Sequence, residues 1–379
     1  MRVVALENGT THAQMKHKWH FYGPARWEGR LVLYLCCSNL ISGFGLAAYA
    51  LFLHLVRRSN PSGFFNSSFY RLAFSLAVPD MLTLVLNLTY FTPAAIFGEA
   101  NLSFWHVYLA GFCHDVAFWS VVGHMLIICF NRFAAVSFGS SYVQVFSGCK
   151  LLWWIMSAYV LGFTVPVIMW SCSCYYHVPS GWGWEFTCGH NTKCRTFAMK
   201  LNEVLCFATV AILSTLHLII YLQVICMKLR WTKKWEASGK LSRRTVTRRE
   251  LSMVCQFSII SLVLGIHVVF FWIVTPRVQQ GYISPQIGMV PLHITLLLNS
   301  AINPFLYMIF AVDGRRALHK FYAEIRGKEY HTVASSEMKP MAGSRSLKPS
   351  SGYPLISASE APSKILNDNV YFAIGDVLL

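Results

Sequence analysis

Seven long apolar runs constrain this 379-residue chain more than any other feature of its sequence. The first run, 31–56, contains no charged residue and lies between Arg30 and Arg57. Each run has the length of roughly 20 residues that a helix needs to cross the hydrocarbon core of a bilayer. The seven runs cover residues 31–56, 72–97, 107–129, 151–170, 204–227, 252–275 and 283–310. We therefore predict an all-α integral membrane protein, a bundle of seven transmembrane helices within residues 31–311.

The composition argues against a water-soluble enzyme. Apolar residues make up 55% of the chain and charged residues 13%, whereas soluble domains contain roughly 25% charged residues. The formal net charge is +16, which on a soluble protein would suggest nucleic-acid binding. The placement of the basic residues gives a different explanation, and we expect no nucleic-acid partner.

Lysine and arginine are unequally shared between the two sides of the predicted bundle. If the N-terminus is outside, the outer segments contain 9 of these residues and the inner segments 23, with 9 of them in the loop 228–250. Because basic residues are enriched on the cytoplasmic side, we predict an outer N-terminus and an inner C-terminus. The basic inner surface suits the anionic lipid headgroups of the plasma membrane, in which we place this multi-pass chain.

This orientation divides the chain into four parts. Residues 1–30 form an extracellular segment and 31–311 the bundle. Residues 312–331 are predicted to form a short amphipathic helix on the inner membrane surface, and 332–379 a disordered cytoplasmic tail rich in Ser, Pro and Gly. The sequons at Asn8 and Asn101 fall outside, where they are predicted to be glycosylated.

Three short motifs occur in order along the runs. They are Leu76-Ala77-Val78-Pro79-Asp80, Asn131-Arg132-Phe133 and Asn303-Pro304-Phe305-Leu306-Tyr307. On seven spans these motifs resemble the rhodopsin-like G-protein-coupled receptors, which carry Leu-Ala-x-x-Asp, Asp-Arg-Tyr and Asn-Pro-x-x-Tyr at these places. The Asn-Arg-Phe variant, followed by Tyr142-Val-Gln-Val-Phe146-Ser147, most closely resembles the nematode serpentine chemoreceptors of class x.

The resemblance implies a chemosensory receptor that binds a small molecule outside and signals to a heterotrimeric G protein inside. It also implies arrestin binding by the serine-rich tail. No cofactor or metal ion is expected. The residues that it assigns to activation are Asp80, Asn131, Arg132, Asn299, Ser300, Asn303, Pro304 and Tyr307.

Asp80 lies in the middle of its run, where an unpaired charge costs roughly 3 kcal/mol. We expect it to face the bundle interior, with Asn299, Ser300 and Asn303 as partners. A cluster that only packs the helices together is the alternative. The family sometimes binds sodium here, but Val121 stands where a serine ligand is common, which weakens that expectation.

The inner end of the third run carries Arg132, which the resemblance places against the G protein. A simple basic anchor at the inner membrane surface is the alternative interpretation. Asn131 lacks the charge of the usual aspartate, so we expect a weaker resting lock and elevated ligand-independent signalling.

Several family features are missing. Leu46 follows Gly45 where asparagine is common, and the sixth run has no Cys-Trp-x-Pro motif. Trp272 is therefore interpreted as an interface ring rather than as an activation switch. The seventh run contains no lysine that could form a Schiff base with retinal, so a covalent retinal chromophore is excluded.

Four cysteines lie in the outer loop between the fourth and fifth runs, in an oxidising compartment. They are Cys172, Cys174, Cys188 and Cys194. Sequence alone leaves three complete pairings open. Cys113 on the third run is a further candidate that would tether the loop to that helix.

The outer half of the third run is unusually polar. We predict that His114, Asp115 and Trp119 contact the ligand, since ionisable groups within a membrane are functional candidates. Local pairing of His114 with Asp115 is the alternative, and we assign His124, His217, His267 and His293 no role beyond the core. A transporter or channel is the second function considered and a membrane enzyme the third, but the runs contain neither repeats nor catalytic motifs.

Overall fold

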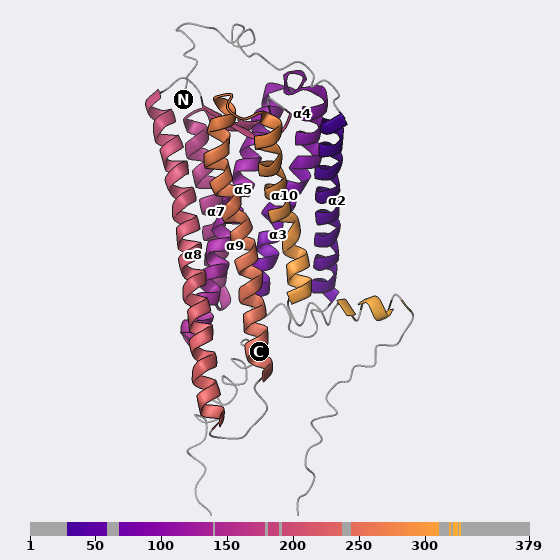
Figure 1. Cartoon of the computed structure of the whole chain (residues 1–379). Coiled ribbons are helices and arrows are strands. Elements are labelled where there is room, and N and C mark those ends of the chain that lie inside the picture. The colour runs from indigo at the N-terminus through magenta and orange to yellow at the C-terminus, as the bar shows by residue number, and fades with distance from the viewer. Residues whose placement is uncertain are drawn as a thin grey trace, which may run out of the picture.

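The computed structural model describes residues 29–58, 68–138, 141–178, 181–188, 192–236, 244–310, 318–319, 321–324 and 326. Within this part, seven helices are long and apolar enough to span a membrane, which confirms the seven predicted spans. They run side by side in one bundle, and α8 and α9 project beyond the others at one end (Figure 1). Asn8 and the predicted tail lie outside the described residues.

Each span corresponds to one long helix except the second. The helices are α2 (Gly29–Arg58), α3 (Ser68–Leu86), α4 (Thr92–Phe97), α5 (Phe104–Ser137), α7 (Gly148–Ser171), α8 (Thr192–Glu236), α9 (Arg244–Gln279) and α10 (Pro285–Phe310). Short elements connect them: η3 (Asn87–Phe91), η4 (Glu99–Asn101), α6 (Tyr142–Val145), β1 (Cys174–His177) and β2 (Glu185–Cys188).

Most helices are longer than the apolar runs that predicted them. α5 continues past Arg132 to Ser137, and α8 begins at Thr192, well before the apolar run at 204. A bilayer requires apolar residues only over its hydrocarbon core, whereas helical hydrogen bonds can continue into the polar layers on either side. The apolar runs therefore gave the number and order of the helices but underestimated their lengths.

The second span contains a π-helical turn, η3, between α3 and α4. The backbone N–H of Thr92 donates to the carbonyl of Asn87, five residues earlier. Pro93 has no N–H and cannot make a regular helical bond, and a π-bulge accommodates such an interruption. The turn buries Asn87, whose amide donates to Ser42 Oγ on α2 at 2.9 Å. The bulge thus provides a polar link between the first two spans.

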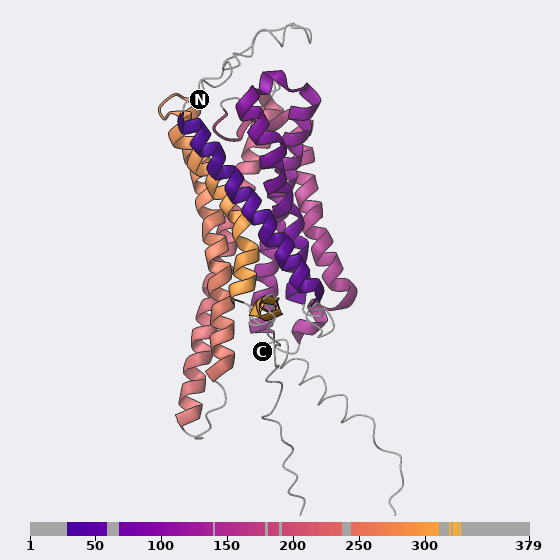
Figure 2. The same cartoon turned by 90° about the vertical axis from the view of Figure 1, so that its right-hand side faces the viewer.

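α5 is the most buried of the seven spanning helices. It packs against α3, α7, α8 and β1, while α2 crosses the bundle obliquely beside α3 and α10 (Figure 2). Glycines permit the close approach of α5 to α7, as is common between membrane helices. A Cβ on Gly123 would lie 2.9 Å from the carbonyl oxygen of Ala158, and one on Gly162 would collide with Ser120.

The strands β1 and β2 pair in antiparallel fashion at the end of the bundle where α2 begins (Figure 1). Following the charge distribution of the sequence, we call this end outer and the opposite end inner. β1 packs directly on α5, because a Cβ on Gly111 would lie 2.1 Å from the backbone oxygen of Tyr176. The hairpin therefore covers the outer half of the central helix.

The described residues of the predicted amphipathic helix are helical at 318–319 and 321–324. Leu318 and Phe321 pack against the core of the bundle, and the Phe321 ring lies edge-on to His54 of α2 at 5.9 Å. The apolar face expected from the sequence is thus turned toward the bundle, while Tyr322 is half exposed. The rest of 312–331 lies outside the described residues apart from Arg326.

The glycine contact between α5 and α7 predicts an asymmetry between two Gly→Ala variants. Gly123→Ala places a methyl group against the Ala158 backbone and is expected to destabilise the fold by about 1–3 kcal/mol. Gly43→Ala on α2 is the matched control, because it is exposed and nothing lies within 4 Å of its Cβ. Thermal unfolding of the purified variants in detergent measures both, and equal stabilities would contradict the proposed contact.

Candidate functional site

A small cavity lies below the hairpin in the outer half of the bundle. α5, α8, α9, α10 and the hairpin all contribute to its wall. Aromatic rings dominate the lining, among them Phe118, Tyr176, Trp184, Phe271 and Trp272. The enclosed space is about 30 Å³, room for a water molecule or two, whereas pockets for drug-sized ligands measure roughly 300–1,000 Å³. A larger ligand therefore requires a side chain to move.

Trp184 lines the cavity and packs against several other aromatic rings. Its ring stacks on the imidazole of His114, with centroids 4.1 Å apart and planes 6° from parallel. On its other neighbours it stacks with Tyr90 at 5.3 Å and packs beside Phe91. Trp184 comes from the loop between β1 and β2 and is 6% exposed. An aromatic ring of the hairpin is thus stacked directly on a histidine of α5.

Three histidines from three helices line this one cavity. His114 lies on α5, His267 on α9 and His293 on α10. All three are buried. The sequence gave no role to His267 or His293, because an isolated histidine on an apolar helix is usually a core residue. Only the packing of α9 and α10 against each other brings them to one space.

Of the three residues predicted to contact a ligand, only His114 lines the cavity. Asp115 and Trp119 are buried elsewhere around α5. At 100° per residue, Asp115 lies about 100° and Trp119 about 140° around the helix from His114. Phe118, one turn after His114, takes the place that we expected for Trp119. The prediction thus selected the correct level of α5 but only part of the correct face.

The position of Trp272 differs from the sequence prediction. We interpreted it as an interface ring, but it lines the cavity and packs against Phe271 and Phe207. The helix α9 continues to Gln279, which places Trp272 about two turns inside its outer end.

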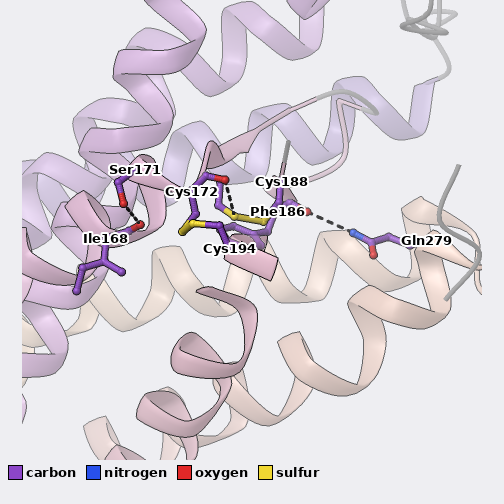
Figure 3. The surroundings of a disulfide bond; sticks show 8 residues. Ile168, Ser171, Cys172, Phe186, Cys188, Cys194 and Gln279 are labelled. Atoms are coloured by element: carbon purple, nitrogen blue, oxygen red, sulfur yellow. Dashed lines mark hydrogen bonds between the residues drawn. A yellow bond between two sulfur atoms is a disulfide. The ribbon is translucent and has the colours of Figure 1, made fainter. Parts of the chain in front are cut away.

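Two disulfides hold the outer loop. Cys172 pairs with Cys194, and Cys174 pairs with Cys188 (Figure 3). The first joins the end of α7 to the start of α8, and the second joins β1 to β2. Cys113 is a free thiol, so the alternative of a tether from this cysteine to the loop is wrong. Among the three open pairings, the structure thus selects a nested one.

The loop is further held by a buried carboxylate. Glu99, just before α5, accepts hydrogen bonds from the Tyr90 hydroxyl, from His177 Nδ1 at 3.1 Å and from the Val178 backbone N–H at 2.9 Å. Burial alone would raise the pKa of Glu99, but the hydrogen bonds and charge of His177, with those of Tyr90 and Val178, bring this pKa below its ordinary value. We call Glu99, Tyr90, His177 and Val178 the outer latch.

Asp80 lies in the bundle interior as predicted, and it is fully buried. One oxygen, Oδ2, accepts from the Asn303 amide at 2.7 Å and from the Tyr49 hydroxyl at 2.6 Å. The Tyr49 hydroxyl also lies 3.2 Å from the backbone oxygen of Ser300. Tyr49 stands one turn after Leu46, so it supplies from α2 the polar group that the missing asparagine would have given.

Asn131 is buried and takes part in a hydrogen-bonded cluster at the inner end of α5. Its amide donates to the Tyr142 hydroxyl at 3.0 Å and lies 3.4 Å from Ser68 Oγ, and these two hydroxyls also contact each other. This cluster, which we call the inner triad (Ser68, Asn131 and Tyr142), joins α3, α5 and α6. The sequence had shown Tyr142 only as part of the family resemblance.

Arg132 and Tyr307 meet the same aromatic ring. The guanidinium carbon of Arg132 lies 3.8 Å from the Phe69 ring centre, a cation–π distance. Tyr307 packs edge-on to the same ring at 5.9 Å and beside Phe52 at 5.5 Å. The Tyr307 hydroxyl is buried and makes no hydrogen bond to any described residue. Phe69 thus connects the two motifs at the inner end.

The remaining predicted residues are placed as follows. Asn299 and Ser300 are buried on α10, and of the two Ser300 interacts with Asp80. α10 continues as a helix through Pro304. His124 bonds Ser75 and the Ser120 carbonyl, so it is a satisfied core histidine, as expected. Asn101 is exposed at the outer end and donates to the Phe97 carbonyl.

The family model described as serpentine type 7TM GPCR chemoreceptor Srx matches residues 40–302 of the chain. The match covers more than half of the sequence and runs from within α2 to within α10. It confirms the resemblance expected from the Asn-Arg-Phe motif. No curated protein matches the chain.

The outer latch predicts a pH dependence. Because the folded pKa of Glu99 lies below its ordinary 4.5, the carboxylate contributes stability above that pH and loses it as the pH falls through the lowered folded pKa. Glu99→Gln is expected to cost about 1.5–3 kcal/mol at neutral pH, a difference that shrinks under acid. Thermal unfolding from acid to neutral pH measures this difference. Glu203→Gln, which removes the more exposed ion pair with Lys200, is the control and should show no comparable loss of stability. If Glu99→Gln lost the same free energy of unfolding at every pH, the proposed latch would be contradicted.

Proposed function

Since the chain belongs to the serpentine type 7TM GPCR chemoreceptor Srx family, we propose that it detects a small molecule at its outer end and activates a heterotrimeric G protein at its inner end. The observation that carries this proposal is the cavity under the hairpin, lined by histidines and aromatic rings of three helices and the hairpin. A concave apolar space with a few converging polar groups is the usual form of a small-molecule site.

Two helices connect the cavity to the inner end. α10 carries His293 in the cavity wall and, further inward, Asn303 and Tyr307. α5 carries His114 in the wall and Asn131 and Arg132 at its inner end. A ligand that shifts α9 and α10 relative to α5 changes the environment of Asp80, which Asn303 and Tyr49 hold from two other helices. This arrangement supports transmission by helix movement.

The inner end offers the elements that would receive this movement. The inner triad fixes α5 to α3 and α6, and Arg132 rests on Phe69 beside Tyr307. Displacement of α10 removes Tyr307 from Phe69 and frees the Arg132 side chain to extend toward a G protein. The basic loop 228–250 adds positive charge at the same end, where it suits anionic lipid heads as well.

The proposal includes the plasma membrane as location, the outer N-terminus, glycosylation of Asn101 and arrestin binding by the tail. The exposed position of Asn101 at the outer end supports glycosylation. The family is one of receptors rather than enzymes, and it does not favour a transporter or channel.

Nucleotide exchange tests the signalling step. The full chain in lipid nanodiscs is expected to accelerate exchange on a purified G-protein heterotrimer of at least one class. Arg132→Ala should remove most of that acceleration, because the guanidinium is the group proposed to meet the G protein, while thermal stability shows that the variant is folded. A folded wild-type chain that accelerates none of the classes would remove the proposed coupling.

The inner triad predicts basal activity. Tyr142→Phe removes the hydroxyl that accepts from Asn131, a bond worth roughly 0.5–1.5 kcal/mol. If the triad holds the resting state, basal exchange should rise about two- to tenfold, since 1.4 kcal/mol is a factor of ten. Asn131→Asp should lower it, because a carboxylate accepts more strongly and carries charge beside Arg132.

Tyr221→Phe is the control for the triad, because Tyr221 is exposed on α8. It should leave basal exchange unchanged. Unchanged exchange in Tyr142→Phe as well, at equal expression, would show that the triad is only structural.

A further inference from the structure

The cavity has an unusual balance of polar groups. Its ionisable side chains are three histidines, Tyr176 and Cys206, and none of the described residues that line it is Asp, Glu, Lys or Arg. Asp115, the nearest acid on α5, interacts electrostatically with Tyr176 and Cys206 but does not line the cavity. The cavity wall therefore offers imidazole nitrogens that can accept a proton, and none of its described residues carries a carboxyl group.

Two contacts of the Tyr34 hydroxyl bear on which nitrogen of His293 carries the proton. The hydroxyl contacts Nδ1 of His293 and lies 3.1 Å from the Trp182 carbonyl, to which it can donate its one proton. We therefore assign the proton of the neutral imidazole to Nδ1, which leaves a lone pair on Nε2. Nε2 is buried and has no hydrogen-bond partner among the described residues, and the side chain is 2% exposed.

His267 is held in the same way. Its Nδ1 lies 3.4 Å from the Thr295 hydroxyl, and that hydroxyl donates its proton to the Leu292 carbonyl at 2.8 Å. We assign the proton of His267 to Nδ1 in the same way, which leaves a lone pair on Nε2. Two neighbouring helices, α9 and α10, thus each bring an imidazole with a basic nitrogen to the wall of one cavity.

The shape of the cavity specifies the rest of the ligand. Phe118, Tyr176, Phe271 and Trp272 provide flat apolar walls. Trp184 shows that a planar ring fits against His114 at stacking distance. A ligand ring of that kind can take the place of Trp184 if the hairpin shifts, and it keeps the stacking contact with His114.

Resting on the proposed receptor function, we propose that the ligand is a small aromatic carboxylic acid that binds together with its proton. The acid O–H donates to the free Nε2 of His293 or transfers its proton there, leaving a carboxylate paired with an imidazolium. The aromatic ring lies among the flat walls. A naked carboxylate would be poorly solvated in this space, whereas the acid brings its own compensating proton.

Other ligand charges fit less well. An ammonium group could donate to Nε2, but its charge would stay buried with no carboxylate in the wall to pair with it. A neutral amide can donate a hydrogen bond to Nε2 but cannot transfer a proton to it, so it forms no ion pair with His293. The groups that face the bound acid are His114 on α5, His267 on α9, His293 on α10, Cys206 on α8 and Tyr176 on β1.

The test compares three matched series on the purified full chain in nanodiscs, with a chelator present to exclude adventitious metal. The probes are benzoate, phenylacetate and indole-3-acetate, each with its amide and its amine, and binding is measured by calorimetry between pH 6 and 8. At least one acid should bind more tightly than its amide and amine. Because one proton is taken up with each carboxylate, its Kd should rise about tenfold per pH unit, while the amides show no slope.

His293→Phe should weaken the acid at least tenfold and abolish the pH slope. His106→Gln, on the outer surface, is the matched control and should leave both unchanged. The wild-type slope does not depend on the folding of any variant. Failure of all three acids to bind, tighter binding of an amine, or an acid whose Kd is independent of pH would overturn the proposal.

Binding and signalling are read separately. Acid binding without nucleotide exchange would leave this inference standing and refute the proposed coupling. Basal exchange on a G protein in a chain that binds none of the acids would do the reverse.

Discussion

A carboxylate at the centre of a bilayer has to find its hydrogen bonds within the protein, and the rest of this bundle is organised around that requirement. Asp80 receives two bonds from two different helices, one from Tyr49 and one from Asn303. Neither water nor lipid can replace them in the hydrocarbon region. The first, second and seventh spans are thereby fixed at one point, and any movement of α10 has to alter this point.

The same rule explains the other polar contacts between spans. Asn87 reaches Ser42 from a π-turn, and Asn131 reaches Tyr142. Apolar packing cannot specify helix positions strongly in a membrane, because lipid tails are as apolar as the side chains, so small residues and polar pairs set the geometry. Glycines at 123 and 162 do so between α5 and α7.

Much of the fold could be predicted from the sequence, since predominantly apolar runs of about 20 residues form transmembrane helices in a bilayer. The Asp80–Asn303 contact was also predictable, because a mid-span acid needs a partner at the same depth. Tyr49 was not, since a single tyrosine in an apolar run gives no sign of the direction in which its hydroxyl points. The cavity was harder still: His267 and His293 are far from His114 in sequence, and only the azimuthal orientation of three helices brings them together. The outer hairpin has only four residues per strand, too few for a pattern that the sequence could reveal.

The nested disulfides have a mechanical consequence. Both bonds lie within residues 172–194, and α5 shares no covalent bond with this loop, since Cys113 is a free thiol. The hairpin is thus a cross-linked cap that contacts α5 at Gly111 and through the rings of Trp184, Tyr175 and Tyr176, while the outer latch joins it to η3 and η4. Movement of this cap away from α5 would break only noncovalent contacts with that helix and would leave both disulfides and the strand pairing intact. It would therefore need no change of redox state.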